Sequence, residues 1–224
     1  ELAGQMPLTE EFYGPSTAAS FGIFGMLREG LNGGSTTLTP ATTTDTARGQ
    51  YNLYTSTATN GRIGVMATAS PTQILFGGES IALKARIFIE SLAATTTNEL
   101  VLRHGFLDSL SGEPVDGAYF RYSHANANWI CVTRSNDSET THTTSVAVVE
   151  DAWIKHHIKV NAAGTEVEFY INGSLVHTAT GTIPTGASRY TSFGTSCIKS
   201  AGSVDNDLFL DYFQIIPDPT STRF

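Results

Sequence analysis

Two glutamates are spaced so that their carboxyl groups could act together on a glycosidic bond. Glu166 and Glu168 flank Val167, and residues two apart in a β-strand point to the same face of a sheet. Retaining glycosidases use two carboxyl groups about 5–5.5 Å apart for this chemistry. Here Phe169 and Tyr170 follow without a third acidic residue, and strand alternation turns Val167 and Phe169 inward. We therefore expect both glutamates to face solvent, without a catalytic role.

Other catalytic patterns are also missing from the sequence. Asp207 and Asp211 lie four apart in an expected strand and should share a face, but Asp211 is more typical of a carboxylate that bonds loop amides or a neighbouring Arg. No Gly-x-Ser-x-Gly nucleophile motif occurs. Gly77-Gly78 follows an expected strand and opens no helix, so it does not predict a phosphate site. We expect no catalytic residues and a non-enzymatic protein.

The six histidines do not show the spacing of a metal site. His156 and His157 are adjacent, so in a strand they point to opposite faces, and the others are scattered. The loops at 136–139 and 205–207 carry the oxygen donors that Ca²⁺ prefers, although such loops are more often ordinary turns. We predict no metal and no cofactor. The alternatives are Ca²⁺ at these loops, or a metal bridged by histidines on a trimer axis.

One segment carries the residue types that bind sugars, which are aromatic rings with planar amides beside them. The candidate residues for a glycan site are Tyr122, His124, Asn126, Asn128 and Trp129. Tyr190 and Phe193 form a weaker second patch. Against this interpretation, Trp129 and Trp153 stand at the starts of expected strands, where tryptophan usually packs into a sandwich, and a core position is favoured for Trp129.

The elements that would hold these residues are β-strands. Residues 81–90 place apolar side chains at every odd position, with Lys84, Arg86 and Phe88 between them. Residues 153–160 alternate in the same way, so that His156 shares the side of the isoleucines and His157 shares the side of the lysines. A period of two residues is typical of strands with one buried face.

Turn signals divide the rest of the chain into further strands. Asn172-Gly173 between two alternating runs predicts a hairpin with a type I′ turn. Other strands are expected at 99–107, 118–123, 128–134, 143–149 and 207–216, with a loop at 108–117. Short strands separated by turns roughly every 8–12 residues indicate a sandwich or barrel. We predict one all-β domain over residues 1–224.

Residues 1–50 form a Thr- and Gly-rich N-terminal segment. Glycines interrupt residues 21–31, and each costs up to about 1 kcal/mol in a helix interior, so we expect a strand or irregular structure there. Residues 32–48 are predicted to form a polar loop plus an edge strand, or alternatively an arm that contacts a partner or neighbouring subunits. The chain starts at Glu1 without a start Met or a signal peptide, which we interpret as a processed or trimmed end.

Composition and cysteine usage limit the partners. The 224 residues include 13 Lys and Arg against 21 Asp and Glu, a formal net charge of −8. Scattered positive charge in an acidic chain argues against nucleic acid and anionic membrane surfaces. No run of about 18 apolar residues occurs, so no membrane span is predicted. Cys131 and Cys197 are more typical of two free buried thiols than of a disulfide, which is the alternative.

Several short motifs, taken together, resemble a known family. They are GFLDS (105–109), DGAYFRY (116–122), NW (128–129), the tryptophan strand at 153–161, TEVEFYING (165–173), TIPTG (182–186), IKSAG (198–202) and LDYF (210–213), with FYG (12–14), RIG (62–64) and LFGG (75–78). The set resembles the concanavalin A-like lectin/glucanase (LamG-like) domains of tailed-bacteriophage virion proteins. This resemblance implies an antiparallel jelly-roll β-sandwich of the concanavalin A-like type.

The resemblance also implies a setting, because such domains occur in virion fibres, spikes and decoration proteins. The fold hosts packing, sugar binding and sugar hydrolysis alike. We predict a non-enzymatic phage virion structural protein, a capsid decoration, head-fibre or tail-fibre component. It would be assembled in the host cytoplasm, pack on other virion proteins and form a homo-oligomer, with a trimer favoured. The alternatives are an adhesin that binds a host-surface glycan and, third, a glycan-degrading enzyme.

Overall fold

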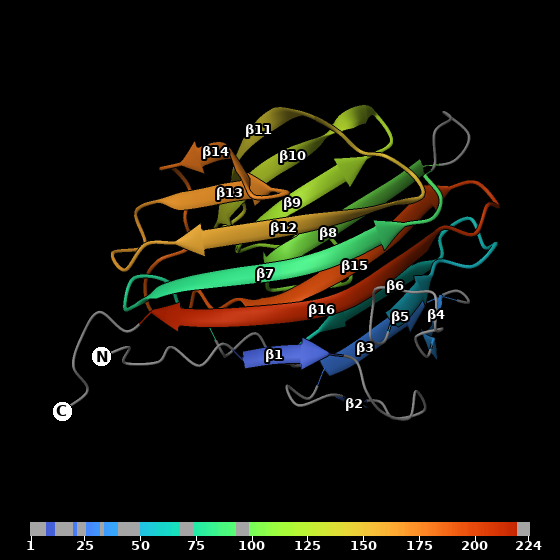
Figure 1. Cartoon of the computed structure of the whole chain (residues 1–224), viewed down its shortest axis with the longest axis horizontal. Helices are drawn as coiled ribbons and strands as arrows, with labels where there is room; N and C mark the ends of the chain where they lie inside the picture. Colours follow the sequence, from blue (N-terminus) through green and yellow to red (C-terminus); the bar gives the residue numbers. More distant parts are fainter. Residues whose placement is uncertain are drawn as a thin grey trace.

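The computed structural model describes residues 8–11, 20–21, 26–31, 34–39, 50–67, 74–92 and 99–218, and these residues form strands joined by turns. Two antiparallel sheets make up this part of the chain (Figure 1). The predicted all-β jelly-roll sandwich is confirmed. In the described ranges no helix is long and apolar enough to cross a membrane.

Sheet A has eight strands. Its order is β14 (Ser174–Ala179), β13 (Val167–Ile171), β12 (Ala152–Val160), β7 (Ser80–Ile89), β16 (Asp207–Asp218), β5 (Gln50–Tyr54) and β4 (Ser35–Thr39), and β1 (Leu8–Glu11) also pairs with β16. Figure 1 shows β12, β7 and β16 side by side across the middle of the view. Strands from distant parts of the sequence are therefore neighbours in this sheet.

Sheet B also has eight strands. Its order is β11 (Ser138–Ala147), β10 (Asn126–Ser135), β9 (Gly117–Ser123), β8 (Glu99–Leu107), β15 (Ser192–Ala201), β6 (Arg62–Met66), β3 (Met26–Leu31) and β2 (Ser20–Phe21). Four of these strands, from β8 to β11, follow one another in sequence, and β15 joins them to the N-terminal strands.

The core lies between the inward faces of the two sheets. On β7, the odd positions 83–89 are buried and Lys84, Arg86 and Phe88 are half-buried on the opposite face, which confirms the predicted alternation. Sheet B contributes Leu102, Phe106, Phe120, Trp129 and Phe193 to the same cluster. Burying each large apolar side chain contributes about 1.5–3 kcal/mol, so this cluster is the main source of stability.

The predicted Asn-Gly hairpin is confirmed. Asn172 and Gly173 have φ values of 49° and 86°, the left-handed region that a type I′ turn requires at both central residues. The side chain of Asn172 accepts a hydrogen bond from the Lys155 amide at 2.9 Å. This bond ties the turn between β13 and β14 to the neighbouring strand β12.

The N-terminal segment contributes strands to both sheets. Residues 26–31 form β3, which pairs with β6, so the expectation of a strand there is confirmed. Residues 35–39 form β4, the last strand at one end of the order of sheet A. Residues 1–7, 12–19, 22–25, 32–33 and 40–49 lie outside the described residues. Contacts of this segment with partners or sister subunits stay a prediction.

Both cysteines are free and buried, as predicted. Cys131 lies on β10 and Cys197 on β15, and both side chains belong to the core between the sheets. Burial raises the pKa of each thiol to about 12. The thiols therefore stay protonated and act as small core residues.

Candidate functional site

The five residues predicted to bind a glycan occupy two different environments. Tyr122 and Trp129 are only 4% and 0% exposed and belong to the core, which confirms the core position favoured for Trp129. His124, Asn126 and Asn128 lie on or beside the turn between β9 and β10 and are half-buried. The structure therefore does not bring the five side chains together on one surface. Of the second patch, Tyr190 is exposed and Phe193 is buried.

The two asparagines of this turn bond the local backbone. The side-chain oxygen of Asn126 accepts a hydrogen bond from the Asn128 amide at 3.0 Å. The Asn128 amide group donates to the carbonyl of Thr144 at 2.9 Å, and His124 Nε2 lies 3.7 Å from a Glu99 carboxylate oxygen. These contacts hold the turn against its neighbours.

Glu166 and Glu168 point away from the core, as predicted. Val167 and Phe169 are buried, and Glu168 lies on the outward side of β13, 3.4 Å from Lys159 Nζ. Asp211 forms an ion pair with Arg86 at 2.9 Å, which confirms the expectation of a neighbouring Arg. A register shift between Leu210 and Tyr212 makes Asp211 the extra residue of a β-bulge.

The structure also places the residues considered for metal binding. His156 is buried and His157 is half-buried on the opposite face of β12, as predicted. Asn136 and Asp137 form the two-residue turn between β10 and β11, with φ values of 52° and 64°. Within the described ranges, no group of three or more His, Cys, Asp or Glu side chains is arranged to hold a metal ion.

The outward face of sheet B is covered by its own chain. Residues 108–116 form a strap in which Leu110 is only 6% exposed and packs beside Gly64. Arg62 donates a hydrogen bond to the Ser111 carbonyl at 3.0 Å. The carboxylate of Glu113 accepts hydrogen bonds from Arg103, Arg121 and the Tyr119 hydroxyl. This strap leaves less of sheet B free for a ligand.

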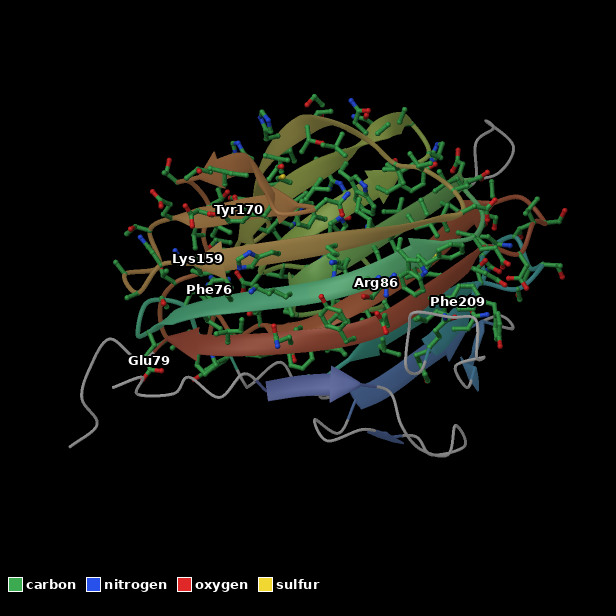
Figure 2. All side chains as sticks on the ribbon, in the orientation of Figure 1. Phe76, Glu79, Arg86, Lys159, Tyr170 and Phe209 are labelled. Atoms are coloured by element: carbon green, nitrogen blue, oxygen red, sulfur yellow. The ribbon has the colours of Figure 1, made fainter. Side chains whose placement is uncertain are left out.

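The outward face of sheet A carries side chains from four adjacent strands. Figure 2 labels one residue from each: Tyr170 on β13, Lys159 on β12, Arg86 on β7 and Phe209 on β16. The register aligns these strands in cross-strand rows. Successive rows are about 7 Å apart along the strands, and neighbouring strands are about 4.8 Å apart.

The row at one end of this face is aromatic. Phe88 lies between Trp153 and Phe209, with ring centroids 5.3 Å and 5.8 Å away. The Arg86 guanidinium lies 4.3 Å from the centroid of the Trp153 ring, a cation–π contact. All three rings are half-buried, so each presents part of its surface to solvent.

Another row is polar and contains Tyr170, His157, Lys84 and Gln214, in that order across the sheet. The rings of Tyr170 and His157 are stacked with centroids 4.9 Å apart. Lys84, His157 and Lys159 line a depression of about 190 Å³. Burial, followed by the charges of Lys84 and Lys159, lowers the pKa of His157 to about 4, so the ring is neutral at pH 7.

A larger hollow of about 620 Å³ adjoins this depression, and both are lined by Ser80 and Ile81. It lies between the loop at 74–79 and Gly186-Ala187, and the exposed Leu75 lies on its wall. Gly77 and Gly78 line the hollow, so the Gly-Gly pair seen in the sequence shapes this opening.

The sequence did not predict a binding site on the outward face of sheet A, and it favoured a position inside the sandwich for Trp153. That expectation is wrong, because Trp153 lies on the outward side of β12 with Lys155 and His157. The alternation of 153–160 contained this signal, since it already grouped Trp153 with the lysines. The pairing of β12 with β7 and β13 could not be read from alternation alone.

The comparisons with known proteins agree with the fold. The chain matches no curated protein sequence. The crystal structure of SO2946 from Shewanella oneidensis MR-1 has a TM-score of 0.62 at 12% identity, covering 98% of this chain and 89% of that one. The endo-β-1,4-glucuronan lyase of the fungus Trichoderma reesei has a TM-score of 0.61 at 9% identity, covering 96% and 99%.

A third similar structure is that of botulinum neurotoxin type C, described as depending on two ganglioside molecules to enter cells, with a TM-score of 0.55 at 12% identity. The match covers 96% of this chain and 48% of the toxin chain. At these identities the likeness shows the fold alone, and the predicted lectin-like β-sandwich is confirmed. Residues 46–211 match the family model described as SO2946-like, C-terminal domain. The chain therefore belongs to the SO2946-like C-terminal domain family.

Proposed function

We propose that this domain is a glycan-binding module and that the outward face of sheet A is its binding surface. The observation that carries the proposal is the combination of half-buried aromatic rings with polar side chains on one face. Trp153, Phe88 and Phe209 form one row, and Tyr170, His157, Lys84 and Gln214 form another. The apolar faces of sugar rings pack on such aromatic surfaces, while sugar hydroxyls bond the amide and charged groups.

The separation of Glu168 from Asp211 on this face favours binding over hydrolysis. Glu168 lies on β13 and Asp211 on β16, and each is held by a cation, Lys159 and Arg86 respectively. Three strand spacings separate β13 from β16, which is roughly 14 Å. Hydrolytic carboxyl pairs lie no more than about 9.5 Å apart. We therefore propose that the face holds a glycan without cleaving it.

Three similar structures support a sugar ligand by their descriptions. One is a lyase of a β-1,4-glucuronan, one is a toxin that interacts with gangliosides, and one is the carbohydrate recognition domain of Emp46p. These activities belong to those proteins, and the match to the toxin covers 48% of its chain, so the lyase and the recognition domain are the stronger support for a saccharide ligand here.

The setting we propose is a virion surface, as the sequence resemblance implies. A glycan-binding face would there serve attachment to a host-surface glycan. The packing role predicted first from the sequence, as a trimeric capsid or tail component, stays a separate proposal. Sedimentation at micromolar concentration measures the oligomeric state of the domain, and a monodisperse monomer contradicts the trimer.

Binding to a glycan array tests the proposed function. We expect the unmodified domain to bind, and Tyr170→Ala and Trp153→Ala to weaken binding at least about tenfold, which corresponds to ~1.4 kcal/mol. Asn126→Ala, in the turn first predicted to bind sugar, is the matched control and should bind normally. Thermal unfolding of each variant shows that the fold is retained.

The outcomes are distinct. Loss of binding in Asn126→Ala, with full binding in Tyr170→Ala, would return the site to the turn between β9 and β10. Release of new reducing ends from a bound polysaccharide would show that the domain is an enzyme and contradict a purely binding role.

A further inference from the structure

The depression on the outward face of sheet A concentrates positive charge in an acidic protein. Its lining consists of Ser80, Ile81, Ala82, Lys84, His157, Lys159 and Ile216. The whole chain has a formal net charge of −8, yet among the described residues two lysines and no acidic side chain line this depression. A local excess of positive charge in a concave site raises the local concentration of anions.

Lys84 is the less compensated of the two lysines that line the depression. It makes no ion pair with any of the residues that the structure describes, and it lies between His157 on β12 and Gln214 on β16, both of which are uncharged at neutral pH. Arg86, one row away, is held by Asp211 and by the Trp153 ring instead. The charge of Lys84 is therefore free to meet a ligand.

Lys159 is only weakly engaged. Its ammonium lies 3.4 Å from a Glu168 oxygen, and its side chain is 50% exposed. Exposed ion pairs of this kind contribute little to stability. An anion in the depression can therefore share Lys159 with Glu168 at little cost.

His157 adds a neutral imidazole to the lining of the depression, and Tyr170 adds an aromatic plane beside it. His157 is half-buried and neutral at pH 7, so it carries one ring N–H. Its ring stacks on Tyr170, whose own ring is half-exposed beside the depression. A sugar ring on Tyr170 would place a substituent next to the two lysines.

We infer that this depression binds the anionic group of an acidic sugar, a carboxylate or a sulfate ester. Lys84 and Lys159 supply the positive charge, and the neutral His157 ring lines the site beside them. The volume of about 190 Å³ fits one such group with part of its ring and is small for a longer segment. This inference rests on the proposed glycan-binding function and names the class of glycan.

Calorimetric titration with three oligosaccharides of equal length tests the inference. One is a uronate, one is a sulfated sugar, and one is neutral, each measured at low and high salt. We expect at least one of the acidic sugars to bind about tenfold more tightly than the neutral one. The difference should shrink at high salt, because screening weakens exposed charge contacts.

Three substitutions locate the effect. Lys84→Gln should remove most of the preference for the acidic sugar, and Lys84→Arg should largely preserve it. Lys155 lies on β12 at an exposed position of the same face of sheet A, outside the depression. Lys155→Gln removes the same charge there and should change the preference for the acidic sugar less than about twofold.

The possible results distinguish failure of the anionic subsite from failure of glycan binding itself. Equal affinity for acidic and neutral sugars, or a preference that survives in Lys84→Gln, overturns the anionic subsite and leaves glycan binding intact. Absence of binding to any glycan overturns both. A uronate that binds alone assigns a carboxylate, and a sulfated sugar that binds alone assigns a sulfate ester.

Discussion

His104 and His156 face each other across the interior of the sandwich, with ring centroids 5.5 Å apart. His104 comes from β8 of sheet B, and its Nδ1 is hydrogen-bonded to the Thr195 hydroxyl at 2.6 Å. His156 comes from β12 of sheet A and stacks on Phe120 at 4.1 Å. Among the described residues, neither ring nitrogen of His156 has a hydrogen-bond partner. The two sheets thus meet at a pair of buried neutral imidazoles.

This pair predicts that the domain loses stability in acid. Burial lowers the pKa of His104 to about 3 and that of His156 well below 6.5, the latter also through His104. The unfolded chain takes up protons near pH 6.5 that the folded chain excludes, so stability is full above pH 6.5 and falls as the pH drops. Each histidine contributes a loss of about 1.4 kcal/mol per pH unit.

Replacing His156 by leucine tests this dependence. The variant should lose less stability than the unmodified domain between pH 6.5 and 4.5, as measured by urea unfolding at each pH. Ile158→Val, at a buried position of the same strand, removes no titratable group; it is the control and should retain the original slope. An unchanged slope in His156→Leu contradicts the role of the buried pair.

Gly105 is predicted to tolerate no side chain. Its φ is 151°, and a Cβ there would lie 2.6 Å from the Ala118 carbonyl oxygen and from Tyr119 Cα on the neighbouring strand. Gly105→Ala should therefore lower the free energy of unfolding by about 2 kcal/mol or more. Gly112→Ala adds the same methyl group where no atom lies within 4 Å and should be close to neutral. Equal effects in denaturant titrations would refute this account of Gly105.

The strap over sheet B should depend on Glu113. Burial alone would raise the pKa of Glu113, but the hydrogen bonds from Arg103 and Tyr119 and the nearby charge of Arg121 lower it to about 2. The folded pKa is therefore below the unfolded one. The contribution of this carboxylate is present above about pH 4.5 and disappears as the pH falls to about 2.

Glu113→Gln should lower the melting temperature at pH 7, because it leaves the buried Arg103 guanidinium without its charged partner. Asp137→Asn, which removes a carboxylate that is 74% exposed and 3.5 Å from Arg134, should change the melting temperature little. Calorimetry on both variants gives the comparison, and an equal or larger drop in Asp137→Asn argues against the strap contacts.

The sequence predicted the fold better than the site, for a physical reason. Alternation in 81–90 and 153–160 shows which side chains share a face, and Asn172-Gly173 shows one pairing of neighbouring strands. The candidate site requires more, because Lys84 and His157 meet only through the pairing of β7 with β12. That pairing joins distant segments, and its register depends on the packed core. The search for neighbouring aromatic and amide residues in sequence led instead to 122–129, where Trp129 is buried.

The most direct test of the central claim is a nuclear magnetic resonance titration of the labelled domain with a glycan that it binds. If the outward face of sheet A is the binding surface, the largest shifts will come from Trp153, His157, Tyr170, Lys84 and Gln214. The signals of Tyr119, which is buried on sheet B and bonded to Glu113, should stay nearly constant. Shifts that cluster instead on residues 124–128, or on the strap at 108–116, would contradict the claim.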